Sequence, residues 1–463
     1  MSDSWTTSGI DLHVEMKGLG RRRALEAALR EAIADGRLPA GTRLPSSRNL
    51  AVDVGVARNT VVDVYTQLTA EGWLRARRGA ATIVDDRPAA AAPAAAAPAD
   101  SRESWRYDLR PGRPDVSSFP RSAWLAASRR AWNKASDADL DYGDPRGAIQ
   151  LRAVLTGYLG RARGVRTHPS RIVVCSGFTQ AFSLLCHALR QQGASSVAVE
   201  SYGHPQLRPI AAGAGLGAIT APLDEEGADL ASGRGADAAV VTPAHQFPLG
   251  RVMSASRRHA TLAWARAHGA VIVEDDYDGE FRYDRDPLGA LQGLDPDRVV
   301  YVGTASKTLA PGLRLAWLVL PEYLAQPVVD VKILADRQTG ILEQLTLAEF
   351  IASGAYDRHV RRRRLAYRHR RDRLVGALGT GPVQGVSAGL HALVTLADGM
   401  AEEDAVVAAA PHGLALEGLD AYRAGPASRP PALVVGYATP PEHAYEKALS
   451  ILAKLLAVTP ARS

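Results

Sequence analysis

One lysine of this sequence lies in a setting that suits covalent chemistry with an aldehyde. Lys307 follows the apolar run 299–302, whose composition predicts a buried strand. Thr304 and Ser306 precede the lysine, and Arg314 follows it seven residues later. Burial and nearby cations lower the pKa of an amine, so that it can act as a nucleophile, and hydroxyl groups with an arginine can hold a phosphate. The segment therefore predicts a Schiff base between Lys307 and a phosphorylated aldehyde.

A second segment, acidic and aromatic, supplies groups for the ring of such an aldehyde. The segment Glu274-Asp275-Asp276-Tyr277 follows the apolar run 271–273, which also predicts a strand. A carboxylate can pair with a pyridinium nitrogen and keep it protonated, and a phenol can bond the 3′-oxygen of the ring. Because ligands of α/β sheets gather at the carboxyl ends of strands, the two segments together predict a site for pyridoxal 5′-phosphate.

A third segment offers a place for the phosphate. Gly177, Phe178 and Thr179 follow the strand-like run that ends at Cys175, and they open a helical pattern. Backbone amides at the N-terminus of a helix, together with a hydroxyl group, form an anion site. Turns of this kind are common, so the prediction depends on the lysine and the carboxylate that accompany it.

Alternating strand-like runs and helical segments must position these groups. The strand-like runs are short and rich in β-branched residues, and they cover 172–175, 197–200, 238–241, 271–273, 299–302 and 316–320. Such runs between helices predict an α/β fold with a parallel sheet that is covered on both faces. The C-terminal part mixes helices with strands at 390–396 and 432–438, which predicts a smaller α/β subdomain.

The positive charge of the chain is concentrated near the N-terminus. The net charge is +6, and residues 17–84 hold twice as many basic as acidic residues, whereas the remainder is balanced. A basic segment attached to a neutral body is typical of a nucleic-acid-binding module, and a solvated basic face is the alternative.

The basic segment has the pattern of a winged helix-turn-helix. Helical periodicity covers 22–34, a second helix starts after Ser46, and a third covers 59–68. Two short strands, 73–75 and 81–84, predict a β-wing. The third helix is expected to bury Val61, Val62, Tyr65 and Leu68.

Several polar residues of this module are suitably placed to contact DNA. The N-terminus of a recognition helix reaches base edges and phosphates in the major groove, and a wing reaches the backbone or the minor groove. The predicted DNA contacts are Arg48, Arg58, Asn59, Thr60, Arg77 and Arg78.

A segment rich in alanine and proline separates the two regions. Prolines interrupt the alanine run at regular intervals, so no apolar helical face can form, and the segment predicts a semi-extended linker. We expect a DNA-binding domain at 12–85, a linker at 86–107 and a cofactor-binding domain at 108–460.

Composition narrows the cellular setting. The two cysteines, Cys175 and Cys186, lie in apolar context, so that neither a disulfide framework nor a metal site is expected. The first residues lack a signal pattern, and no apolar run approaches the roughly 18 residues of a membrane span. These features predict a cytoplasmic protein without membrane association.

Two family resemblances follow from these motifs. The stretch from Leu38 to Arg48, followed by 55–61, resembles the winged helix-turn-helix of the GntR family. The chain from about 108 to 458 resembles a fold-type I aminotransferase, and the matching segments are 108–115, 142–147, 242–250, 274–281 and 303–314. Taken together, the chain resembles the MocR subfamily of GntR regulators.

The resemblance implies a role for each cofactor contact. Lys307 would form the Schiff base, Tyr277 would bond the 3′-oxygen, and Asp275 would face the pyridine nitrogen, with Asp276 as its rival. The resemblance also implies a head-to-tail homodimer. The residues implied to hold the phosphate are Gly177, Phe178, Thr179, Thr304 and Arg314.

The sequence departs from its relatives at two places in this region. Relatives often carry Glu-Asp-Pro-Gly-Tyr where residues 200–204 read Glu-Ser-Tyr-Gly-His, so either His204 or Tyr202 would cover the ring. Aminotransferases bind the substrate carboxylate with an arginine just before a C-terminal strand, and Arg429 is offset from that position. The second departure argues against efficient transamination of a standard amino acid.

We expect a DNA-binding transcription regulator that senses pyridoxal phosphate, or an amine or amino acid that forms an aldimine with it. One alternative is an active aminotransferase that carries a DNA-binding module, and turnover of an amino donor with a keto acid would favour it. Another is a cofactor fold retained only as a dimerisation scaffold, which would lack the absorbance of the bound cofactor.

Overall fold

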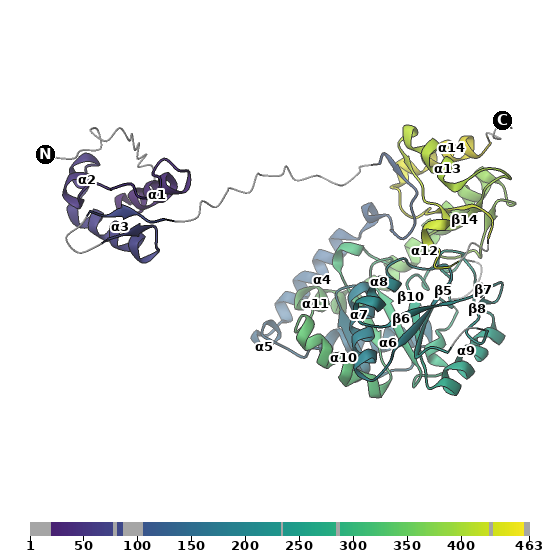
Figure 1. The fold of residues 1–463 in the computed structure, drawn as a ribbon. Coiled ribbons are helices and arrows are strands. Elements are labelled where there is room, and N and C mark those ends of the chain that lie inside the picture. Colours follow the sequence, from purple (N-terminus) through teal and green to yellow (C-terminus); the bar gives the residue numbers. More distant parts are fainter. Residues whose placement is uncertain are drawn as a thin grey trace. The chain divides into compact units, whose positions relative to one another are not determined.

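The computed structural model describes residues 20–76, 81–86, 105–232, 235–283, 288–425 and 429–457. The chain divides into two units, Met1–Glu103 and Ser104–Ser463 (Figure 1). Within the described ranges, no helix combines the length and the apolar character needed to cross a bilayer.

The described residues of the N-terminal unit form three helices followed by a two-stranded wing, as the sequence predicts. The hydroxyl of Ser46 accepts a hydrogen bond from the backbone N–H of Asn49 and so caps the second helix. The elements in chain order are α1 (Arg21–Ala34), α2 (Ser47–Asp53), α3 (Arg58–Ala70), β1 (Leu74–Arg75) and its antiparallel partner β2 (Ile83–Val84).

Helix α3 buries one face and exposes the other. Val62 was expected inside, but it is 40% exposed because it lies about 100° around the helix from its buried neighbour. Its position one turn after Arg58 places both side chains on the solvent-facing side. The buried residues recur at helical spacing and are Val61, Val64, Tyr65 and Leu68.

The C-terminal unit is built on a mixed sheet of seven strands. We expected a parallel sheet, but β12 runs antiparallel to both of its neighbours, while the other neighbouring pairs are parallel. In spatial order the strands are β4 (Ile172–Cys175), β12 (Ala316–Val319), β11 (Val299–Thr304), β10 (Val271–Asp276), β9 (Ala238–Val241), β5 (Ser196–Glu200) and β6 (Gly217–Ala221).

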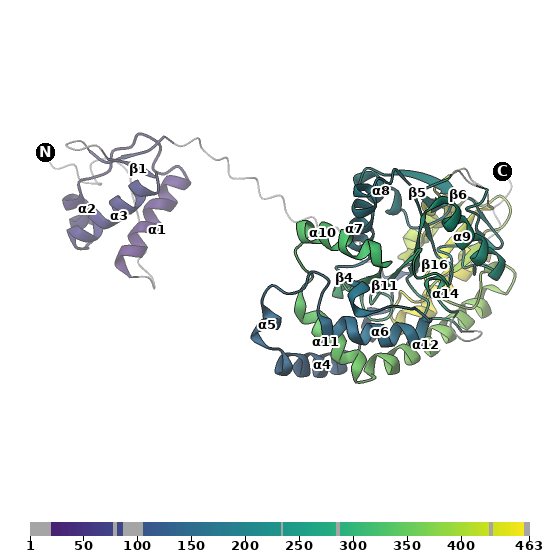
Figure 2. The same ribbon diagram turned by 90° about the horizontal axis from the view of Figure 1, so that it is seen from below.

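Helices cover both faces of this sheet (Figure 2). Successive strand residues point to opposite faces, so Val273 packs in the core of α7 and Ile272 in that of α9. The first face carries α7 (Phe178–Gln191), α8 (Leu207–Gly213) and α10 (Glu322–Ala335). The second carries α4 (Arg121–Lys134), α6 (Ile149–Arg163), α9 (Ala255–His268) and α11 (Ile341–Ala352).

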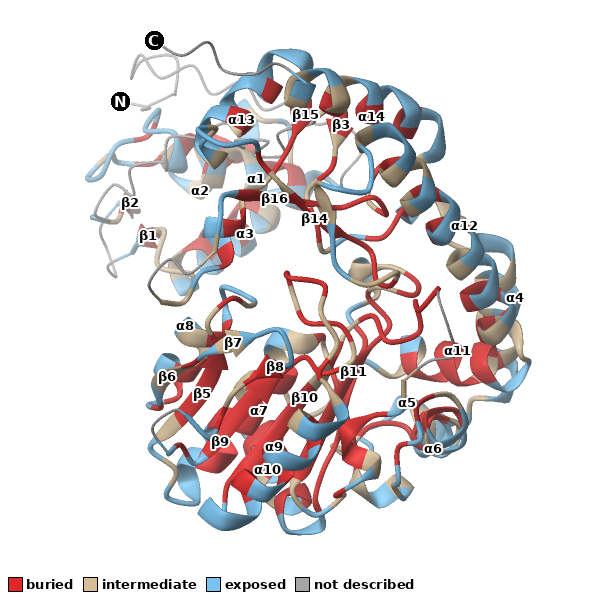
Figure 3. Ribbon diagram, turned by 90° about the vertical axis from the view of Figure 1, so that its right-hand side faces the viewer, coloured by how far each residue is buried: buried red, intermediate tan, exposed pale blue. Residues whose placement is uncertain are grey.

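A smaller subdomain follows the long helix α12 (Ala355–Leu378), and it has an apolar core of its own (Figure 3). The segment β3 (Tyr107–Asp108), early in the unit, pairs with β15 (Leu414–Ala415) of this subdomain. The other elements are an antiparallel sheet of β13 (Val383–Gln384), β14 (Ala392–Thr395) and β16 (Ala432–Val435), with helices α13 (Glu402–Ala409) and α14 (Glu442–Ala457).

Candidate cofactor site and DNA-reading helix

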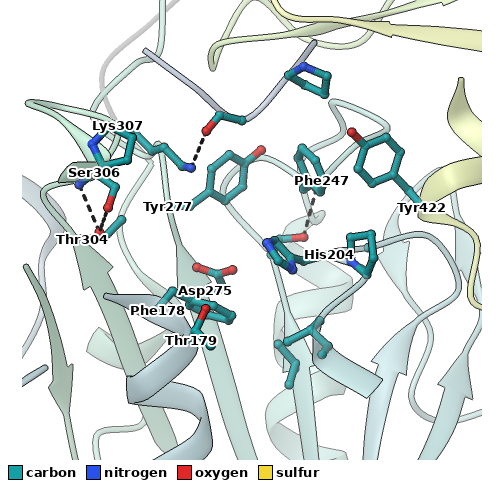
Figure 4. A pocket seen from close by; sticks show the side chains of 18 of the residues that line it. Phe178, Thr179, His204, Phe247, Asp275, Tyr277, Thr304, Ser306, Lys307 and Tyr422 are labelled. Atoms are coloured by element: carbon teal, nitrogen blue, oxygen red, sulfur yellow. Dashed lines mark hydrogen bonds between the residues drawn. The ribbon is translucent and has the colours of Figure 1, made fainter. Parts of the chain in front are cut away.

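A cavity of about 380 Å³ lies at the carboxyl ends of the large-sheet strands. Side chains from both subdomains line this cavity, and Tyr422 reaches it from the smaller subdomain (Figure 4). The predicted cofactor residues among the lining residues are Phe178, Thr179, His204, Asp275, Tyr277, Thr304, Lys307 and Arg314. A volume of this size suits a small-molecule ligand.

Lys307 follows β11 and points into this cavity beside Tyr277 (Figure 4). Its Nζ donates a hydrogen bond to the backbone oxygen of Gly112 at 2.6 Å. Burial lowers the pKa of the amine, and the carboxylates of Asp275 and Asp278 oppose that effect. A lysine in this environment loses its proton more readily than a solvated one, as a nucleophile requires.

The alternation of β10 separates the two rival aspartates. Asp275 points to the same face as Val273 and lines the cavity. Asp276 points to the opposite face, where its carboxylate accepts two hydrogen bonds from Arg163 at 2.6 and 2.9 Å. Burial raises the pKa of Asp275 to about 8, although Lys307 acts against this rise. A cationic ring nitrogen would stabilise the ionised form of this carboxyl group.

A cradle for an anion lies at the start of α7. Gly177 caps the helix with a φ of 93° and a ψ of 169°, a conformation that glycine adopts without strain. A Cβ at this position would lie 2.6–2.8 Å from the guanidinium of Arg314, which itself donates to the Ser176 oxygen at 2.6 Å. The first turn of α7, whose N–H groups have no partner within the helix, therefore begins beside this guanidinium.

The structure places the two candidates for covering a ring in different surroundings. His204 lines the cavity, and burial lowers the pKa of its imidazole, with Lys307 adding to the effect. Tyr202 is 2% exposed and packs instead with Leu249 and Leu419, outside the lining residues. A neutral aromatic ring at position 204 is suited to stacking on a flat ligand.

Sequence reasoning missed several lining residues, among them Arg113, Glu200, Phe247 and Tyr422. Glu200 ends β5 and accepts a hydrogen bond from the Thr242 hydroxyl at 2.7 Å, and burial raises its pKa to about 7. Its position at a strand end was a usable signal. Arg113 and Phe247 come from loops and Tyr422 from the short 3-10 helix Leu419–Tyr422, all far apart in the chain, and only the fold brings them together.

Arg429 lies outside the lining of the cavity. Its Nη2 donates to the oxygen of Leu223 at 3.4 Å, and its Nη1 lies 3.6 Å from Glu225. The cations that line the cavity within the described residues are Arg113, Lys307 and Arg314. Arg429, which the sequence already offsets from the position of a carboxylate-binding arginine, is therefore engaged elsewhere.

The lining residues fit the chemistry of pyridoxal 5′-phosphate. A desolvated amine, a buried carboxyl group and an anion cradle without room for a Cβ surround one cavity. These groups match the aldehyde, the ring nitrogen and the phosphate of the cofactor, respectively.

The predicted DNA contacts lie on the exposed surface of the N-terminal unit. Arg58 and Asn59 begin α3 and are exposed, and Thr60 is half-buried. Arg48 is exposed in the first turn of α2. The other two candidates, Arg77 and Arg78, lie outside the described residues.

Comparisons with known proteins match both units. Residues 21–84 match the bacterial regulatory proteins of the gntR family, and residues 112–417 match aminotransferase class I and II. The HTH-type pyridoxine biosynthesis transcriptional regulator PdxR of Corynebacterium glutamicum is 34% identical over 87% of this chain and 88% of its own. The probable rhizopine catabolism regulatory protein MocR of Rhizobium meliloti is 34% identical over 75% of each chain.

The C-terminal unit also matches solved aminotransferases. A kynurenine aminotransferase of Pyrococcus horikoshii, solved in complex with PMP, has a TM-score of 0.68 and 25% identity over 76% of this chain and 91% of its own. The fold is thus that of the pyridoxal-phosphate aminotransferases, and its combination with a GntR-type DNA-binding domain is that of the curated regulators. This chain belongs to the MocR subfamily of GntR transcriptional regulators.

Proposed function

We propose that this regulator binds pyridoxal 5′-phosphate at Lys307 and that its DNA affinity depends on the bound cofactor, or on an amine or amino acid that reacts with it. One observation carries the proposal: Lys307, Asp275 and Arg314, against which Gly177 packs, line a single cavity. The cofactor supplies an aldehyde and an electron-withdrawing ring.

Each residue has a definite task in this proposal. Lys307 provides the amine that holds the aldehyde, and Asp275 pairs with the ring nitrogen. The hydroxyl of Tyr277 donates a hydrogen bond to the 3′-oxygen, and His204 stacks on the ring. Arg314, Thr179, Thr304 and the amides that follow Gly177 and Phe178 hold the phosphate.

The state of the cofactor can reach the DNA only if it favours one arrangement of the protein over another. An effector amine that takes the place of Lys307 frees that side chain, whose Nζ donates to the Gly112 oxygen in the described state. Gly112 belongs to the segment that leads from the linker into the C-terminal unit, so the change begins close to the path toward the DNA-binding domain. A homodimer would present two such domains to paired half-sites.

Regulation is favoured over efficient transamination by the position of Arg429. This arginine contacts Leu223 and Glu225 rather than the cavity, so a substrate carboxylate lacks the partner that aminotransferases provide. The related proteins that share both domains are named as regulators.

Two measurements test the proposal. Borohydride reduction of the cofactor-saturated protein, followed by peptide mass spectrometry, should find the modification on Lys307. A footprint on the promoter of the protein's own gene should change when the cofactor is added. A modified peptide that lacks Lys307, or a footprint that the cofactor leaves unchanged, would contradict the proposal.

A further inference from the structure

A buried hydrogen-bonded pair lies directly behind the phenol of Tyr277. The Nδ1 atom of His245 is 2.8 Å from the Oδ2 atom of Asp278, and both side chains are almost inaccessible to solvent. The same Nδ1 atom is 3.1 Å from the hydroxyl oxygen of Tyr277. Neither His245 nor Asp278 lines the cavity, so the pair can act on a ligand only through the tyrosine.

The chemistry of the pair fixes its hydrogen atoms. An ionised carboxylate only accepts hydrogen bonds, so the Nδ1 atom of His245 carries a hydrogen and donates it. The oxygen of Tyr277 lies within reach of the same donor. Burial raises the pKa of Tyr277 well above its ordinary value, and the neighbouring aspartates Asp275 and Asp278 add to this effect. The phenol therefore keeps its own hydrogen, for which Asp278 and a cofactor oxygen in the cavity are alternative acceptors.

The smaller subdomain holds this pair in place. Gly389 has a φ of 76°, and a Cβ there would overlap the His245 ring and lie 2.6 Å from the Oδ2 atom of Asp278. The ring of His391 lies 5.1 Å from that of His245, and its Nε2 bonds the oxygen of Pro248. The backbone N–H of Gly389 donates to the oxygen of Phe281, so the two subdomains meet at the pair.

A metal ion is the other chemistry that these side chains suggest. Ligand atoms of His245, Asp278 and His391 all lie within 4.8 Å of one another. The imidazole nitrogen that faces Asp278 is already hydrogen-bonded to it, and the remaining nitrogen of His245 is buried without a partner near Gly250. If Nδ1 were a metal ligand, Nε2 would carry the hydrogen, and it lacks the partner that metal-ligating histidines normally have. If Nε2 were the ligand, Nδ1 and Asp278 would keep their hydrogen bond, and Asp278 would orient the ring rather than bind the ion.

We infer that His245 and Asp278 form a positioning pair that directs the hydroxyl hydrogen of Tyr277 into the cavity, toward the 3′-oxygen of the cofactor. Gly389 of the smaller subdomain leaves the space that this pair occupies. The inference rests on the proposed function. It assigns no contact with the cofactor to either member of the pair, and Tyr277 is the residue through which both act.

The pair should set the pH at which the bound cofactor changes its absorbance. A donor to the 3′-oxygen stabilises the anionic oxygen and so lowers the pH at which the neighbouring nitrogen, supplied by Lys307, loses its proton. The other titratable groups near Tyr277, Lys307 and His245 are Asp275, Arg113, His204, His391 and Tyr437. Each of them is unchanged in the variants that follow.

The test is a pH titration of the cofactor band at about 420 nm in the full-length, cofactor-loaded protein. His245→Leu should raise the midpoint by about one pH unit, since one hydrogen bond is worth about that much. Asp278→Asn should also raise the midpoint. His245→Asn should restore the wild-type midpoint, because the asparagine amide places an N–H donor close to the position of the imidazole Nδ1.

Two controls separate positioning from loss of stability. Asp295→Asn removes another buried carboxylate, which pairs with Arg266 at 2.8 Å, and should leave the midpoint unchanged. Gly389→Ala should raise the midpoint. Gly379→Ala should not, because Gly379 also has a positive φ, of 83°, but no atom lies within 4 Å of its Cβ position.

The outcomes are distinguishable. Wild-type midpoints in His245→Leu, Asp278→Asn and Gly389→Ala would overturn the inference while leaving the cofactor site intact. If His245→Leu does not fold, the other two variants decide. Absence of the band from the wild-type protein at saturating cofactor would instead overturn the proposed function, because a shift in midpoint requires the band to exist.

Discussion

Replacement of Gly177 by alanine should weaken cofactor binding with little change elsewhere. The Cβ of the new residue would lie 2.6–2.8 Å from three atoms of the Arg314 guanidinium, closer than side-chain carbons approach such atoms. The end of an arginine side chain is flexible, so we expect the guanidinium to move out of the cradle rather than the helix to break.

The magnitude follows from the contact that is lost. A hydrogen bond to a charged group is worth about 1.5–3 kcal/mol, which corresponds to a rise of about 10- to 150-fold in the dissociation constant of the cofactor. The substitution also forces alanine into the positive-φ region at a φ of 93°. That strain costs about 1–3 kcal/mol of folding stability and is present with or without the cofactor.

The assay is a titration of the purified apoprotein with pyridoxal 5′-phosphate, followed by absorbance, together with a thermal melt. Gly193→Ala is the matched control, because Gly193 follows the other end of α7 with a φ of 96° and nothing within 4 Å of its Cβ position. Both variants should melt earlier than the wild type, and only Gly177→Ala should bind the cofactor more weakly. Equal dissociation constants in the two variants would refute the cradle.

Three further predictions concern other parts of the molecule. Lys307→Ala should abolish the cofactor band at about 420 nm while operator affinity stays measurable, and a retained band would exclude Lys307. Arg58→Ala should weaken operator binding by about 1–3 kcal/mol at fixed salt. Arg37→Ala, a change just after the end of α1, should have a smaller effect, and equal effects of the two variants would show that Arg58 does not read a base. Burial raises the pKa of Glu274 from 4.5 in the unfolded chain to about 7 in the folded protein. As the pH rises from 4.5 to 7, the unfolded chain releases this proton while the folded protein keeps it, so the free energy of unfolding falls. Glu274→Gln should flatten that fall by up to about 3 kcal/mol in urea unfolding, and an unchanged slope would contradict the assignment.

Local patterns in the sequence were sufficient for the elements that carry the site. The run 299–302 and the residues after it predicted a strand followed by a lysine, and β11 with Lys307 has that arrangement. The placement of Asp275 and Asp276 on opposite faces needed the structure, because β10 continues to Asp276 instead of ending at Val273. Once both residues are in the strand, the period of two separates them.

Other features depend on contacts that no local pattern encodes. Short apolar runs carry no information about direction, so the antiparallel β12 was predicted as parallel. Val62 has the hydrophobic character of a core residue but lies on the exposed face of α3. Tyr422 and Phe247 reach the cavity from separate subdomains, and only the packing of those subdomains brings them to it. The roles assigned to the cofactor and DNA contacts remain predictions.

The central claim is that cofactor chemistry at one lysine alters the grip of this protein on DNA. The most direct measurement is the affinity of the full-length protein for its operator, by fluorescence anisotropy, with and without pyridoxal 5′-phosphate, in the wild type and in Lys307→Ala. We predict that the cofactor changes the affinity of the wild type and leaves that of the variant unaltered. The same change in both proteins, or no change in the wild type, would contradict the account.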